Sequence, residues 1–145
     1  MSTVKTVWKA QPQEHDYPAA AAYLSLIAPK HHVDFLVEQL RTAQSARGKA
    51  KDLLRASGLP LLGPDNPHVA RDLEKIHQGV GLSPLLAIRG DLALAVPLVI
   101  ADGYHRLCAS YQHDENLEVE YRVVDRVDVA LFDLPGLCRS TGWRG

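Results

Sequence analysis

The chain lacks the residues and runs that would place it in several large classes of protein. Only two of its 145 residues are cysteine, Cys108 and Cys138. They are too few for a disulfide framework and not spaced as a zinc motif, so we expect a reducing compartment. No apolar run approaches the ~20 residues of a membrane span, and no basic segment followed by an apolar one opens the chain. We therefore expect no membrane partner, no signal peptide and a cytoplasmic location.

An excess of charge of one sign is also missing. Sixteen basic residues face seventeen acidic ones, which gives a net charge of −1 with neutral histidines. No global basic field therefore draws the chain toward nucleic acid, so that partner is not favoured. The 46% hydrophobic and 23% charged content is ordinary for a globular protein. Its length suits one domain, and we predict a single domain over residues 1–145.

Apolar spacing divides the chain into two halves of different character. Helical spacing predicts helices over about 16–28, 33–40, 45–57 and 67–78, the last one starting at the Asn66-Pro67 pair. The second half reads as strands over 85–88 and 97–101, a helix over 103–112 and a strand over 117–124. A further short strand is predicted over 4–8. This order predicts an α+β fold in which a helical half covers a small β-β-α-β sheet.

The run from Leu98 to Ser110 is the most informative part of the sequence. A β-type segment ends in Asp102-Gly103 and turns directly into a helix that begins with His105 and Arg106 close together. A helix N-terminus offers free backbone N–H groups and partial positive charge, and a guanidinium fork suits phosphate oxygens. The run therefore predicts an anion site. The alternative is a plain strand–helix corner, with Arg106 paired to Asp102.

Two motifs in this half resemble the ParB/sulfiredoxin superfamily. They are Gly79-Val80-Gly81-Leu82-Ser83-Pro84-Leu85-Leu86-Ala87-Ile88 and Leu98-Val99-Ile100-Ala101-Asp102-Gly103-Tyr104-His105-Arg106-Leu107-Cys108-Ala109. The resemblance covers residues 49–124 and implies a ParB/sulfiredoxin-like mixed sheet, with 1–48 as a helical extension and 125–145 as a tail. It also implies that Gly103, His105 and Arg106 contact the phosphates of ATP or another nucleoside triphosphate, with Mg²⁺ as an optional companion. Ser83 and Pro84 would shape the pocket floor.

Two departures from the superfamily narrow this interpretation. Tyr104 stands where sulfiredoxins carry their reactive cysteine, so that activity is not expected. The chain after Asp125 is too short for the helix-turn-helix region of partitioning ParB proteins. Cys108 is expected to be a buried small hydrophobe.

Several other residues are candidates for the site. Asp102 either caps the helix or serves as a magnesium contact or general base, and Glu74 is the other carboxylate considered for catalysis. Tyr104 either stacks on a base or covers the core edge. Lys51 either reaches a triphosphate or a nucleic-acid backbone, or lies on a solvated helix face. His68 and Arg71 mark a second helix start that suits an anion.

These observations favour a nucleotide- or phosphate-binding domain, with a small kinase or NTPase as its enzymatic form. Two alternatives from other classes stay open. One is a nucleic-acid-associated ParB-like module that binds or cuts DNA, which would use the basic residues between Lys49 and Arg55. The other is a non-catalytic scaffold that forms a homodimer.

Overall fold

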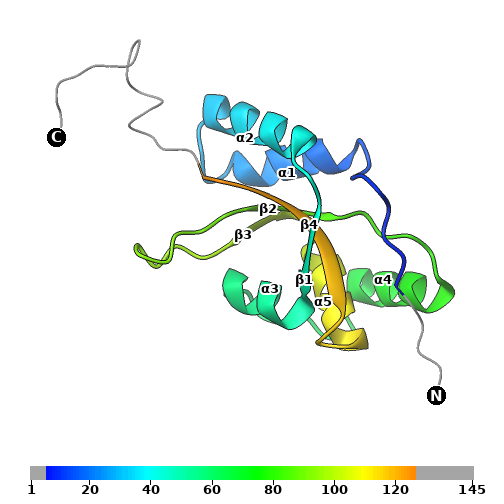
Figure 1. Ribbon diagram of the computed structural model, residues 1–145. Coiled ribbons are helices and arrows are strands. Elements are labelled where there is room, and N and C mark those ends of the chain that lie inside the picture. The colour runs from blue at the N-terminus through cyan, green and yellow to red at the C-terminus, as the bar shows by residue number, and fades with distance from the viewer. Residues whose placement is uncertain (1–5, 127–145) are drawn as a thin grey trace, which may run out of the picture.

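The computed structural model describes residues 6–126, where five helices and a four-stranded sheet form the α+β fold that the sequence predicts. Figure 1 labels these elements, and helices and strands are interspersed along the chain. The elements are α1 (Asp16–Leu24), α2 (Lys30–Thr42), β1 (Ala46–Lys49), α3 (Ala50–Ser57), α4 (Pro67–Gln78), β2 (Leu85–Ile88), β3 (Val99–Asp102), α5 (Tyr104–His113) and β4 (Glu118–Val124). Of the tail predicted over 125–145, the part from residue 127 on lies outside the described residues.

The sheet has the strand order β1-β4-β2-β3 and mixed directions. β4 runs parallel to β2, whereas β1 pairs with β4 and β3 pairs with β2 in antiparallel fashion. All four residues of β2 are buried. This explains why its sequence is a continuous apolar run rather than an alternating one, because a strand covered on both faces needs apolar side chains on both.

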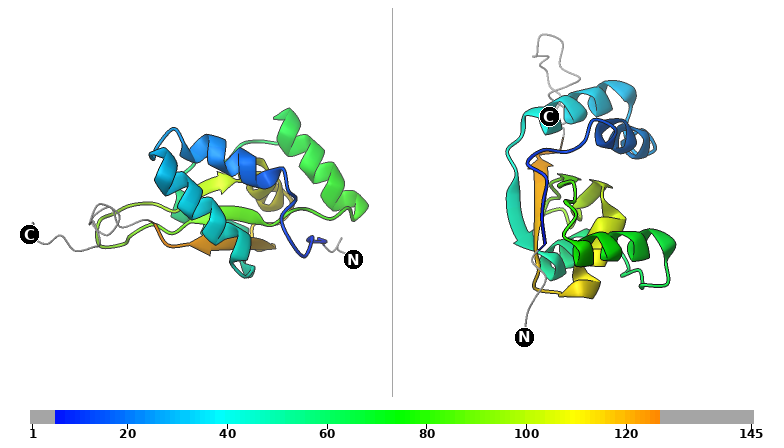
Figure 2. Two further views of the ribbon diagram at one scale, coloured as in Figure 1. Left: turned by 90° about the horizontal axis from the view of Figure 1, so that it is seen from above. Right: turned by 90° about the vertical axis from the view of Figure 1, so that its right-hand side faces the viewer.

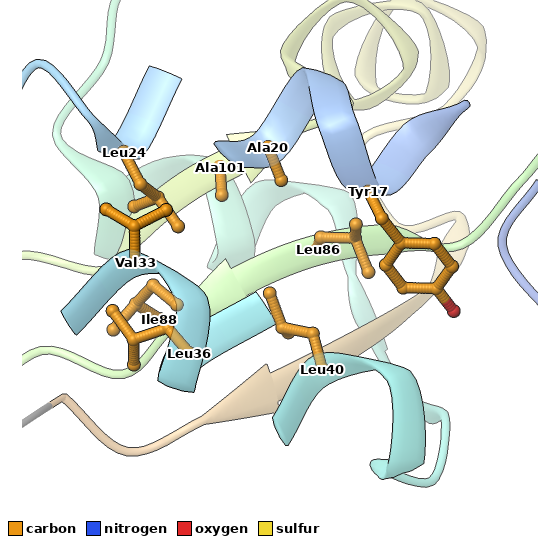
Figure 3. Packing of buried hydrophobic residues seen from close by; sticks show 9 residues of the cluster. All are labelled: Tyr17, Ala20, Leu24, Val33, Leu36, Leu40, Leu86, Ile88 and Ala101. Carbon is orange, nitrogen blue, oxygen red and sulfur yellow. The ribbon is translucent and has the colours of Figure 1, made fainter. Parts of the chain in front are cut away.

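The helices form a layer on each side of this sheet, as Figures 1 and 2 show. Leu86 and Ile88 of β2 pack with the buried residues of α1 and α2, in the cluster drawn in Figure 3. Leu85 and Ala87 pack in a second cluster with residues of α3 and α5. Successive strand side chains point to opposite faces, so four residues of β2 connect both layers.

The structure corrects one predicted element. Residues 45–57 were expected to form one helix, but Ala46–Lys49 form the edge strand β1, and α3 begins only at Ala50. Backbone pairing with β4 and the ion pair of Arg47 with Glu120, at 2.9 Å, favour the extended form there. The first helix also ends at Leu24, earlier than expected. Of the predicted strand over 4–8, the described part contains only an isolated bridge of Trp8 with Leu82.

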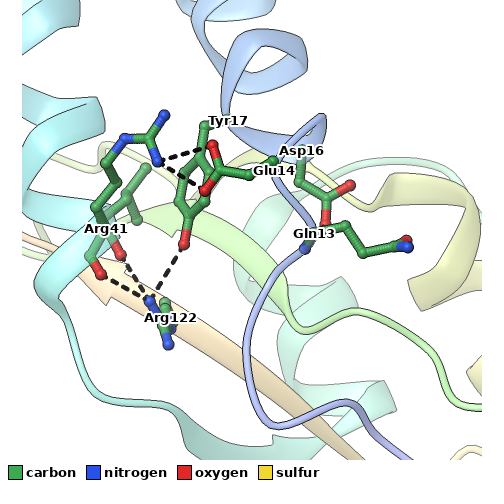
Figure 4. A network of polar contacts seen from close by, with 7 residues as sticks. Gln13, Glu14, Asp16, Tyr17, Arg41 and Arg122 are labelled. Atoms are coloured by element: carbon green, nitrogen blue, oxygen red, sulfur yellow. Dashed lines mark hydrogen bonds and ion pairs between the residues drawn. The ribbon is translucent and has the colours of Figure 1, made fainter.

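Arg122 of β4 connects the sheet to the end of α2 (Figure 4). This buried side chain donates from Nη1 to the carbonyls of Leu40 and Arg41, at 3.2 and 3.0 Å, and to the Tyr17 hydroxyl at 3.3 Å. The two carbonyls belong to the last turn of α2, where no intrahelical donor is left for them. A cation at that end also suits the helix dipole. Arg122 therefore fixes α2 onto the sheet.

Within residues 6–126, none of the helices has the length and apolar character needed to cross a bilayer.

Candidate functional site

A pocket of about 350 Å³ opens where the first turns of α4 and α5 meet. The loop that leads into β2 and the segment before α1 supply its other walls. Its lining is mostly polar and comes from four separate stretches of the chain: Lys9, Gln13 and His15; His68, Arg71, Asp72 and Lys75; Val80, Gly81, Leu82 and Ser83; and Asp102, Gly103, Tyr104, His105 and Arg106.

α4 and α5 run side by side in the same direction. At their starts, the rings of His68 and His105 lie 4.7 Å apart between centroids. At their ends, the rings of His77 and His113 lie 5.7 Å apart. α5 therefore meets the pocket with its N-terminus, whereas α4 lines it with the side that carries His68, Arg71, Asp72 and Lys75. The positive ends of both helix dipoles lie close to each other there.

The start of α5 leaves backbone donors available. Gly103 is the N-cap, with φ 106°, and no side chain caps this helix. The hydrogen bond from Leu107 N–H to the Gly103 carbonyl, at 2.9 Å, is the first of the helical pattern, so the amides of residues 104–106 precede it. The start of α4 differs, because Asn66 Oδ1 accepts from the amides of His68 and Val69 at 2.9 and 3.2 Å. α5 thus contributes free amides, whereas α4 contributes side chains and its dipole.

Arg106 is held inside the pocket by Asp102. Its Nη2 lies 2.9 Å from Asp102 Oδ2, and both side chains are 17% exposed. Nη2 also donates to the Pro84 carbonyl at 3.4 Å, whereas Nε has no hydrogen-bond partner among the described residues. Burial raises the pKa of the Asp102 carboxyl and the Arg106 charge opposes this shift. The ion pair considered as the alternative for Arg106 is therefore present, although the guanidinium still lines the pocket.

The α4 wall adds further cations and a histidine pair. Arg71 Nη2 lies 2.9 Å from His68 Nδ1. Burial lowers the pKa of His105, and the neighbouring His68 lowers it further. Four basic side chains and two carboxylates line the pocket, which gives it a charge of +2 with neutral histidines: Lys9, Arg71, Lys75 and Arg106 against Asp72 and Asp102. The protein as a whole is nearly neutral, so positive charge is concentrated here.

Most residues of the predicted anion site meet in this pocket. Ser83, Asp102, Gly103, Tyr104, His105 and Arg106 all line it. Pro84 is buried behind it, with its carbonyl turned to Arg106. The Tyr104 hydroxyl donates to the Pro60 carbonyl, which fixes the ring beside the 59–64 loop. Asp102 does not cap α5, because its carboxylate pairs with Arg106. Cys108 is buried as a small hydrophobe, as expected.

Two candidates, Glu74 and Lys51, do not line the pocket with the other predicted residues. Glu74 is exposed and accepts a hydrogen bond from Gln78 at 2.8 Å, since it points away from the α4 face that lines the pocket. Lys51 of α3 pairs with Asp52 at 3.1 Å and lines a different surface hollow. Arg55 reaches the same Asp52 at 3.6 Å, so this basic segment is partly neutralised.

Five polar lining residues were missed in the sequence: Lys9, Gln13, His15, Asp72 and Lys75. For Asp72 and Lys75 a signal existed, because they follow His68 and Arg71 at helical spacing on one face of α4. For the three N-terminal residues there was none. Their place depends on the bridge of Trp8 with Leu82, in which Lys9 N–H donates to the Leu82 carbonyl at 2.8 Å.

Comparison with protein-family models, curated proteins and solved structures finds no match to this chain. Among the described residues, no group of three or more histidine, cysteine, aspartate or glutamate side chains is arranged to hold a metal ion by itself.

Proposed function

We propose that this pocket binds the phosphate groups of a nucleoside triphosphate or of another phosphate-bearing ligand. The observation that carries the proposal is the meeting of the uncapped α5 N-terminus with the basic side of α4 in a pocket with net positive charge. Uncapped amides at α5 suit anionic oxygens, and the guanidiniums of Arg71 and Arg106 can bind them in bidentate fashion. The resemblance to the ParB/sulfiredoxin superfamily supports the same conclusion and supplies ATP as the first ligand to test.

A kinase or NTPase activity would need carboxylates beside the bound phosphates. Asp72 and Asp102 are the two that line the pocket, and they replace the pair of Asp102 and Glu74 expected from the sequence. Mg²⁺ commonly binds through one or two carboxylates together with phosphate oxygens, so these two side chains fit an ion that arrives with the nucleotide. The ion would neutralise phosphate charge, and Asp102 would then exchange its contact with Arg106 for one with the ion.

Calorimetric titration tests the proposal most directly. We expect ATP, CTP or GTP with Mg²⁺ to bind, and Arg71→Gln to weaken that binding about tenfold or more, which corresponds to ~1.4 kcal/mol. Arg55→Gln is the matched control, because Arg55 is an exposed helix arginine outside the pocket and should leave affinity unchanged. The proposal is wrong if the protein binds none of the nucleotides at millimolar concentration, or if both variants bind as the wild type does.

The two alternatives remain predictions. The nucleic-acid module would rely on Lys51 and Arg55, which both contact Asp52. The dimeric scaffold would rely on exposed apolar residues such as Leu26 and Ile27 after α1, which are 80% and 58% exposed. Neither alternative explains why charge converges at the starts of α4 and α5.

A further inference from the structure

A pair of histidines lies where the first turns of α4 and α5 meet at the pocket. His68 lies in the first turn of α4 and His105 in the first turn of α5, with ring centroids 4.7 Å apart and planes tilted by 40°. Two imidazolium rings at this distance would repel each other, and both would face the positive ends of two helix dipoles. The arrangement therefore disfavours a charge on both rings at once while no anion is bound.

The contact with Arg71 fixes the state of His68 more closely. A guanidinium has only donors, so the 2.9 Å contact of Arg71 Nη2 with His68 Nδ1 requires a lone pair on that nitrogen. In this contact Nδ1 of His68 is therefore the acceptor. A second proton on Nδ1 would break the contact with Arg71.

An anion in the pocket would reverse each of these effects. Its oxygens attract Arg71, which frees Nδ1 of His68, and they favour the charged form of a nearby imidazole. The other charged groups that face the pair are Lys9, His15, Asp72, Lys75, Asp102 and Arg106. The basic groups outnumber the carboxylates, so together they disfavour a charged imidazole. A bound anion offsets this repulsion.

We propose that anion binding in this pocket is coupled to protonation of the His68–His105 pair, so that affinity rises as the pH falls through the range in which histidine titrates. This inference rests on the proposed function, because it needs an anion in the same pocket. Each proton taken up turns a ring nitrogen that could only accept a hydrogen bond into a donor for the ligand. The pair thereby converts a change of pH into a change of occupancy.

NMR titration of the histidine rings tests the coupling with sulfate as the probe. Sulfate keeps its charge across this range, whereas a phosphate monoester gains a proton near pH ~6 and would obscure the result. We expect saturating sulfate to raise the apparent pKa of His105 by about one unit. His77 and His113 are the internal control, since they form the corresponding pair at the far ends of the same helices.

The outcomes separate the coupling from the proposed function. If the backbone amides of residues 104–106 shift with sulfate while the titration of both histidines stays unchanged, the pocket binds anions and the coupling is wrong. If sulfate, at the highest concentration tested, shifts neither the amides nor the rings, the proposed anion site itself is wrong. In Arg71→Gln, which keeps a donor but removes a charge that lowers the pKa of His105, we expect the pKa of His105 in the free protein to rise. An unchanged value would contradict the role given to Arg71.

Discussion

Gly103 and Gly79 both adopt a positive φ next to a helix, but their surroundings differ. A Cβ on Gly103 would lie 2.8 Å from Leu85 Cγ and 2.9 Å from Arg106 Nη2. A Cβ on Gly79 would meet nothing within 4 Å. Gly103 is thus required for backbone conformation and for space, whereas Gly79 is required for conformation alone. The turn before α5 needs this glycine because strand, helix and the Arg106 side chain meet there.

We therefore expect Gly103→Ala to lower the free energy of unfolding by about 2–4 kcal/mol, since backbone strain and overpacking add. Gly79→Ala should lower it by about 1 kcal/mol through backbone strain alone. Urea denaturation of the two variants measures the difference. Equal losses would show that the space around Gly103 adapts freely, which would contradict the close packing described here.

At the scale of elements, Arg122 shows how one side chain joins two of them. Arg122→Met should lower the free energy of unfolding by about 2–3 kcal/mol, because two carbonyls at the end of α2 lose a charged donor in a buried place. Arg47→Met is the control on the neighbouring strand β1. The Arg47 side chain, which pairs with Glu120, is 62% exposed. Loss of this ion pair should therefore lower the free energy of unfolding by less than about 1 kcal/mol. Similar losses in denaturation experiments would mean that Arg122 does not hold α2 in place.

Elements with local signals were predictable from the sequence. β2 is predicted with its observed bounds because four apolar residues stand between Pro84 and Arg89. α4 is predicted because Asn66 and Pro67 form a start signal that needs no tertiary contact. β1 could not be predicted, since its four residues are mostly exposed and become a strand only beside β4. Its partner lies about seventy residues away, and no spacing within 45–57 shows it.

The candidate site, too, was predictable only where its signal is local. The residues on the α5 side of the pocket are consecutive in the sequence, and this side is recognised from Asp102, Gly103 and Arg106. The α4 side appears in the sequence only as a separate helix start with His68 and Arg71. The starts of α4 and α5 share a pocket because the two helices pack in parallel. This packing is a tertiary property, so the sequence does not show it directly. Glu74 was considered as a second carboxylate, but it does not lie on the face of α4 that lines the pocket.

At the scale of the whole molecule, β2 makes the two helix layers depend on each other. Leu86 faces α1 and α2, Leu85 faces α3 and α5, and both are fully buried. Because adjacent residues of one strand support opposite layers, we expect the layers to unfold together. Amide signals of α2 and α5 followed by NMR should disappear at the same urea concentration.

The variant Leu86→Ala tests whether the two layers unfold together. It should destabilise both layers equally by about 2–5 kcal/mol through the cavity it leaves. Leu92→Ala, at a residue that is 99% exposed, should change stability by less than about 0.5 kcal/mol. Loss of the α2 signals well before those of α5 would instead show that the helical extension unfolds on its own.

The bridge of Trp8 with Leu82 has a practical consequence for anyone who prepares this protein. It holds Lys9, Gln13 and His15 against the start of β2, so a shortened version that begins at α1 would keep its core residues and lose a wall of the pocket. Such a version could give a normal circular dichroism spectrum and still fail every ligand assay. Affinity tags and cleavage sites are therefore better placed at the other end of the chain.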